Sequence, residues 1–88
     1  MDVRQTIGWN LRRLRVAKGL SQERLALAAN IDRSYVGRVE RGAENVTVST
    51  IEALAGVLDV HVSALFQQVD DAAAKPAPLR SGRRPKSG

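Results

Sequence analysis

The stretch that decides the fold is residues 21–42, SQERLALAANIDRSYVGRVERG. It contains two short runs of apolar residues at helical spacing, and these predict two helices. Ser21 and Asp32 stand where N-cap residues belong, one before each run. Residues 29–32 separate the two runs, and Asn30 among them tolerates a positive φ. Two helices joined by such a short connection form the helix-turn-helix layout.

Helical spacing continues on both sides of this stretch. Asp2 is a plausible N-cap for a preceding helix, with Gln5 as its capping-box partner and Gly19 as its left-handed C-terminal residue. Thr47 can cap a fourth helix, and residues 62–66 suggest a brief fifth one. The β-prone residues 45–50 have no plausible partner strand. The sequence therefore predicts a compact, all-α, five-helix domain.

Length and composition exclude several classes of protein. The chain has 88 residues, which suits one domain, and it has no cysteine for a disulfide or a thiolate zinc site. Its single histidine, His61, is better explained as a helix-start surface residue than as a metal ligand. We expect no enzyme activity, metal, cofactor or obligate small-molecule ligand. No apolar stretch is long enough for a membrane span or a secretory signal, so we expect a cytoplasmic protein with no membrane partner.

Positive charge is concentrated towards the C-terminus. The formal net charge is +5, which favours a polyanionic partner such as nucleic acid. Residues 1–69 hold nine basic and seven acidic residues, whereas residues 70–88 hold five basic and two acidic residues with all three prolines. Such a polar segment buries too little apolar surface to fold. We predict a folded domain over 1–69 and a disordered Ala/Pro/Arg-rich basic tail over 70–88.

Several short segments together resemble the Cro/CI-type (Xre-like) helix-turn-helix regulators over roughly residues 5–67. The segments that carry this resemblance are 21–26, 29–31, 34–36, 39–42, 50–55 and 63–66. Within the family, residues 32–37, 40–42 and 45–47 look closest to the controller proteins of restriction-modification systems. Asn30 replaces the turn glycine of most members, a departure that affects the local turn energy alone.

The resemblance implies a DNA-binding domain whose third helix, about residues 33–41, enters the major groove. Arg33 and Ser34 begin that helix, at the end which reaches base edges in this docking geometry. Arg33 can donate two parallel hydrogen bonds to guanine O6 and N7, whereas Ser34 alone is promiscuous. Arg38 lies on a similar face and could contact a base or a phosphate. We expect base contacts from Arg33, Ser34 and Arg38.

We expect phosphate contacts from a second set of residues, namely Ser21, Gln22, Tyr35 and Asn45. The resemblance implies that Gln22 bridges a phosphate and the start of the recognition helix. Each residue also has a plainer explanation. Ser21 can serve as a helix cap, Gln22 as a polar helix-start residue, Tyr35 as a half-buried cover of the core edge, and Asn45 as a turn residue.

Other residues are assigned to structure and assembly. Arg15 and Glu40 match the family's partly buried ion pair between the first helix and the recognition helix. Glu23, Glu44, Glu52 and Asp59 look like solvated surface residues. One small core cannot cover every apolar residue near the end of the domain, so some of these residues should form a dimer interface. The candidates are Val62, Leu65, Phe66 and Val69.

These observations predict a homodimeric transcription regulator that binds double-stranded DNA at a two-fold related operator. Two other classes remain open. An antitoxin-type autorepressor would use the same DNA-binding domain and bind a toxin partner, although residues 70–88 offer little apolar anchor for one. A non-specific architectural protein would also suit a basic tail. The operator sequence and the sign of regulation cannot be read from the residues.

Overall fold

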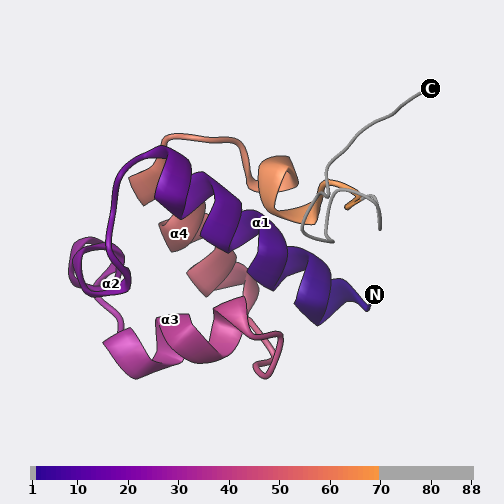
Figure 1. Ribbon diagram of the computed structural model, residues 1–88, viewed down its shortest axis with the longest axis horizontal. Helices are drawn as coiled ribbons and strands as arrows, with labels where there is room; N and C mark the ends of the chain where they lie inside the picture. Colours follow the sequence, from indigo (N-terminus) through magenta and orange to yellow (C-terminus); the bar gives the residue numbers. More distant parts are fainter. Residues whose placement is uncertain (1, 70–88) are drawn as a thin grey trace, which may run out of the picture.

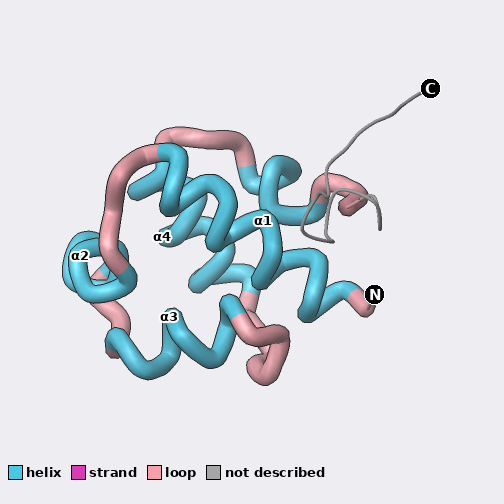
Figure 2. The backbone as a smooth tube through the Cα atoms, viewed as in Figure 1, coloured by secondary structure: helices cyan, strands magenta, loops and turns pink. Residues whose placement is uncertain are grey.

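A computed structural model describes residues 2–69, and it is helical throughout its regular elements (Figures 1 and 2). No strand occurs in this part of the chain, in agreement with the all-α prediction. The predicted tail, residues 70–88, lies outside the described residues. The elements in chain order are α1 (Val3–Ala17), α2 (Gln22–Ala29), α3 (Arg33–Glu40), α4 (Val48–Leu58) and the 3-10 helix η1 (Val62–Phe66).

The first helix begins and ends at the predicted residues. The Gln5 backbone N–H donates to Asp2 Oδ1 at 3.0 Å, and the Asp2 N–H donates to Gln5 Oε1 at 2.9 Å, which completes a capping box. The bond from the Gln5 N–H keeps the pKa of the Asp2 carboxyl below its ordinary value. Gly19 follows the helix with a φ of 76°. Glycine has no Cβ to oppose that conformation.

Two more predicted caps are present. Ser21 Oγ accepts from the Arg24 N–H at 3.0 Å, and Thr47 Oγ1 accepts from the Thr50 N–H at 3.1 Å. These bonds satisfy backbone donors that have no partner within the first helical turn. Asn30 ends α2 in the left-handed conformation, with a φ of 59°. Asp59 ends α4 in the same conformation, which the sequence analysis did not anticipate.

The prediction that the Asp32 side chain caps α3 is wrong. Asp32 is the N-cap residue by backbone conformation, but its carboxylate makes no cap hydrogen bond. The Ser34 hydroxyl donates to that carboxylate instead. A serine two residues after the cap therefore competes with the backbone N–H groups for the carboxylate oxygens.

The helices enclose one aliphatic core. Helix α1 packs against α3 and η1, α2 packs against α3 and α4, and α4 also packs against η1. In the view of Figure 1, α1 crosses the middle of the molecule, α3 lies below it and α2 is seen nearly end-on at the left. The buried apolar residues are Ile7, Leu11, Leu25, Ala26, Val36, Val39, Ile51, Leu54, Ala55, Leu58 and Leu65.

The fifth element is a 3-10 helix rather than an α-helix, so the five-helix prediction is correct in place and wrong in type. It begins at His61, whose Nδ1 accepts from the Ser63 N–H at 3.1 Å, and the chain becomes extended at Gln67. A run of five residues suits the 3-10 form, which is used in short pieces. The buried Asn10 amide donates to the carbonyls of Leu65, at 3.1 Å, and Gln67, at 2.8 Å. Helix α1 therefore fixes the end of the domain.

A glycine sets the distance between α1 and α3. A Cβ added to Gly8 would lie 2.4 Å from the carbonyl oxygen of Val39 and 2.7 Å from that of Glu40. These distances are shorter than van der Waals contact, and both obstacles are backbone atoms. Gly8 thus permits α3 to lie close against α1. Because α3 is the helix that is predicted to enter the major groove, Gly8 helps to fix the position of the predicted DNA-binding element.

Candidate nucleic-acid interface

The start of α3 presents the predicted base-reading residues on the surface. Arg33 and Ser34 occupy the first turn and are exposed. The Arg33 guanidinium makes no hydrogen bond or ion pair to any other residue of 2–69. Its donors are therefore available to an external acceptor, as a bidentate contact to a base requires.

Four predicted site residues line one shallow hollow with two residues that the prediction omitted. The lining is Gln22, Arg33, Ser34, Gly37, Arg38 and Arg41. Arg33, Gly37 and Arg41 are spaced by four residues, so they lie along one face of α3. That spacing could have identified Arg41 from the sequence, because it continues the face that begins at Arg33. Gly37 has no side chain, which leaves the floor of the hollow open.

Arg38 is held by side chains on three sides. Its Nε donates to Glu44 Oε2 at 2.7 Å, and its guanidinium carbon lies 5.6 Å from the centre of the Tyr35 ring. A longer contact of 3.5 Å joins its Nη1 to Ser34 Oγ. The Glu44 side chain is 26% exposed, so the description of Glu44 as a solvated residue is wrong. The loop after α3 turns it back towards the helix.

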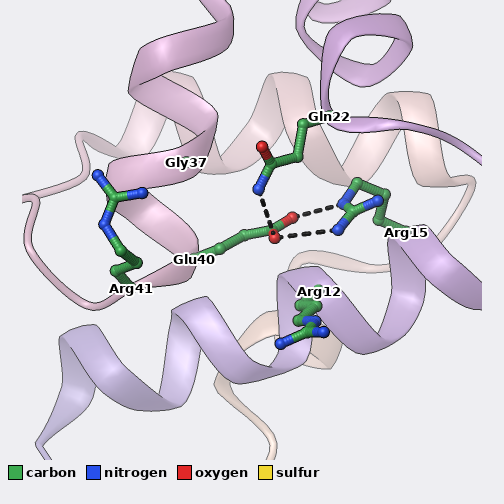
Figure 3. Close-up of a pocket in the computed structure, with 6 residues that line it drawn as sticks. All are labelled: Arg12, Arg15, Gln22, Gly37, Glu40 and Arg41. Atoms are coloured by element: carbon green, nitrogen blue, oxygen red, sulfur yellow. Dashed lines mark hydrogen bonds and ion pairs between the residues drawn. The ribbon is translucent and has the colours of Figure 1, made fainter.

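The predicted ion pair between Arg15 and Glu40 is present (Figure 3). Arg15 donates from Nε to Glu40 Oε2 at 2.6 Å and from Nη2 to Glu40 Oε1 at 3.1 Å. Its Nη1 also donates to the Leu20 carbonyl at 2.8 Å. The two side chains are 13% and 5% exposed, so the pair is largely withdrawn from solvent. This bidentate geometry joins α1 to the end of α3.

Gln22 joins the same cluster. Its Nε2 donates to Glu40 Oε1 at 3.0 Å, so Gln22 contacts the end of α3 rather than its start, contrary to the prediction (Figure 3). Helices α1, α2 and α3 thus meet at one carboxylate. Arg12 and Arg41 line the hollow beside this cluster, and both are exposed. Glu40 is the one acidic residue among those lining it, so cations predominate there.

The remaining predicted phosphate contacts lie in different environments. Ser21 is exposed and caps α2, so its Oγ already accepts one bond. Tyr35 is half-buried and packs against the core, as its plainer explanation holds. Asn45 is exposed in the loop between α3 and α4, next to Glu44. None of these environments prevents a contact to a phosphate.

The predicted dimer residues differ in exposure. Phe66 is 48% exposed, whereas Val62 and Val69 are intermediate. Leu65 is fully buried inside the protomer, so it is unavailable to a partner and leaves the predicted interface. Its burial follows from its place between the α1 and α4 contacts of η1.

Residues 2–69 contain no group of three or more His, Cys, Asp or Glu side chains that could hold a metal ion. None of the described helices has the length and the apolar character that a membrane span needs.

The sequence matches the helix-turn-helix family HTH_3 over residues 11–65. The chain belongs to this family of DNA-binding transcription regulators, of the Cro/CI (Xre-like) type. The match covers the whole of the α2 to α4 region and η1 as far as the buried Leu65. It includes all six residues that line the hollow beside α3.

Individual relatives are regulators by name. The crystal structure of the restriction-modification controller protein C.AhdI from Aeromonas hydrophila superposes with a TM-score of 0.70 at 52% identity, covering 72% of this chain and 96% of that one. The structure of SinR in complex with DNA gives a TM-score of 0.67 at 34% identity, covering 69% and 98%. A hypothetical transcription factor of Neisseria meningitidis serogroup B is 46% identical, covering 67% of this chain and 56% of its own length. The chain spans about half the length of the first curated relatives that it matches.

Proposed function

We propose that the chain is a sequence-specific transcription regulator that binds double-stranded DNA as a homodimer, with α3 in the major groove. The observation that carries this proposal is Arg33, exposed and unengaged within residues 2–69, in the first turn of α3. An arginine in that place can meet guanine O6 and N7 with two parallel hydrogen bonds. The Arg15–Glu40–Gln22 cluster and the Gly8 contact hold the helix that carries it.

Phosphate contacts would come from the basic residues that line the hollow beside the Arg15–Glu40–Gln22 cluster and from the start of α2. Arg12 and Arg41 flank Gln22, and the α2 N-terminus has a positive dipole end. Such contacts set the orientation of a protein on the duplex and carry no sequence information themselves. They would leave base choice to Arg33, Ser34 and Arg38.

A homodimer would give useful specificity, because one small domain reads few base pairs. The interface would include the exposed Phe66 ring, together with Val62 four residues before it and Val69 three residues after it, both of intermediate exposure. Two copies related by a two-fold axis would place their half-sites about 34 to 36 Å apart. Sedimentation at micromolar concentration, with and without DNA, measures this state directly. A strictly monomeric protein that binds DNA one-to-one contradicts the dimer.

The 52% identity with C.AhdI favours a controller role in a restriction-modification system among the possible regulatory roles. Genes for a methyltransferase and an endonuclease beside this gene would support that role, and a toxin gene in their place would favour an antitoxin-type repressor. A reporter placed behind the upstream region then gives the sign of regulation.

Selection of bound fragments from random double-stranded DNA tests the proposed function as a whole. We expect a consensus of two inverted half-sites with at least one guanine in each. We expect a ratio of affinities between the consensus and random DNA of about 10³ or more at one fixed salt concentration. Recovery of unrelated fragments with equal affinity would indicate an architectural protein instead.

A further inference from the structure

The loop after α3 brings a carboxylate against an arginine of the proposed reading face. Glu44 Oε2 accepts from Arg38 Nε at 2.7 Å, and the two side chains are 26% and 43% exposed. The Tyr35 ring lies below the guanidinium, with 5.6 Å between the ring centre and the guanidinium carbon. The pair therefore fixes one edge of Arg38. Among residues 2–69, the Nη1 and Nη2 donors make one further contact, from Nη1 to Ser34 Oγ at 3.5 Å.

We propose that Glu44 is a positioning residue that directs Arg38 to a base edge and away from the DNA backbone. This inference rests on the proposed function and deepens it, because it names the residue that determines whether Arg38 contacts a base or a phosphate. Glu44 itself touches no DNA in this proposal. It acts through the orientation of the Arg38 side chain.

The direction of the effect follows from charge. An arginine side chain has much rotamer freedom, and a free one beside a duplex meets phosphates most easily, because they are the most negative and accessible groups. If Arg38 turned to a phosphate, it would leave the Glu44 carboxylate without its partner and close to a second negative charge. A contact from Nη1 and Nη2 to a base keeps the Nε–Glu44 bond in place. The carboxylate thus opposes the phosphate contact and permits the base contact.

The same carboxylate must also weaken binding to every DNA sequence, because it places a negative charge near the phosphates. Glu44 therefore lowers the affinity for all DNA and raises the discrimination between bases. A partly exposed ion pair has a modest energy, so we expect affinity and selectivity each to change by about 2- to 5-fold.

The test is Glu44→Gln in the full chain, which removes the charge and keeps the size of the side chain. Glu52→Gln is the matched control, because Glu52 is exposed on α4 and makes no ion pair with another of residues 2–69. Affinities are measured at one salt concentration for the selected site, for each single-base variant of it and for random DNA. We expect Glu44→Gln to bind random DNA about 2- to 5-fold more tightly and to lose discrimination at one base pair per half-site by a similar factor. Glu52→Gln should keep the discrimination of the parent at every position.

A double-mutant cycle separates positioning from a simple loss of charge. In an Arg38→Ala background, Glu44→Gln should leave base preference unchanged, because the residue through which it acts is gone. Melting curves of all variants should stay close to that of the parent, since the pair lies at the surface.

Three outcomes overturn the proposal, and they can be distinguished from one another. If the parent discriminates between bases and Glu44→Gln keeps the full preference, this inference is wrong and the proposed function stands. If the parent shows no preference for any base, the proposed function is wrong and this inference falls with it. An unchanged effect of Glu44→Gln in the Arg38→Ala background also overturns the inference, because the effect would not pass through Arg38.

Discussion

A single ion pair, between the guanidinium of Arg15 and the carboxylate of Glu40, holds the orientation of α3 relative to α1. Arg15→Leu would leave Glu40 with a carboxylate that is 5% exposed and has lost two charge-assisted hydrogen bonds. We expect the free energy of unfolding to fall by about 3 to 5 kcal/mol, because the remaining charge is uncompensated. Urea unfolding followed by circular dichroism measures the change.

The double variant Arg15→Leu with Glu40→Leu supplies the control. It removes both charges together, so we expect it to recover most of the stability that the single variant loses. A double variant that is less stable than Arg15→Leu alone would show that the contact stabilises by its shape and not through its charges.

A contact between two side chains can be predicted from the sequence when helical spacing or a family pattern indicates both residues. The family pattern predicts the Arg15–Glu40 pair in this way, and the structure contains it. The contact of Glu44 with Arg38 is not predicted in this way, because Glu44 lies six residues later, outside the spacings at which helical residues meet. Its contact depends on the path of a loop that leaves the helix, and no local rule fixes that path. The bond from Gln22 to the far end of α3 was missed for the same reason, since it depends on how two helices pack.

The packing of helix α1 against helix α3 depends on the absence of a side chain at Gly8. Gly8→Ala would bring a Cβ within 2.4 Å of the Val39 carbonyl oxygen, and a backbone atom cannot rotate away. We expect a loss of stability of about 1 to 3 kcal/mol from the forced separation of the helices. We also expect weaker DNA binding in the protein that remains folded. Thermal unfolding and a DNA titration measure the two effects.

Gly56→Ala is the matched control for this change. Gly56 lies within α4, and a Cβ there would meet no atom within 4 Å. Alanine is the better helix former, so we expect Gly56→Ala to raise stability by up to about 1 kcal/mol. Equal effects of the two substitutions would show that Gly8 matters through helix propensity and not through packing.

Local signals identified the elements well where a cap residue and an apolar period agree, as at Asp2, Ser21 and Thr47. They failed where two groups compete for one acceptor, as at Asp32, whose carboxylate is occupied by Ser34. They also gave the wrong helix type for η1, because five residues are too few for periodicity to separate an α-helix from a 3-10 helix.

The uneven distribution of charge matters at the scale of the whole molecule. Residues 72–88 carry five cations and a single large apolar residue, Leu79, and they lie outside the described part of the structure. We expect deletion of residues 72–88 to leave the melting curve and the consensus site unchanged. Affinity for the consensus site and for random DNA should fall by the same factor. The slope of log K against log salt should become shallower by up to ~0.9 per phosphate contact removed. Titrations at several salt concentrations provide the slopes.

Equal slopes for the full chain and the truncated chain would show that the tail contacts no phosphate. A changed consensus site would contradict the assignment of all base reading to the folded domain, because contacts to phosphates alone carry no sequence information.

The proposed contact between Arg33 and a guanine can be tested by replacing that guanine with 7-deazaguanine. The analogue keeps Watson–Crick pairing and O6 but lacks the N7 acceptor. We expect the parent to lose about 1 to 3 kcal/mol of binding free energy at the substituted position, and Arg33→Ala to bind the natural and the substituted site equally. If 7-deazaguanine weakens binding of the parent and of Arg33→Ala by the same amount, or weakens neither, Arg33 does not read that base and the account is contradicted.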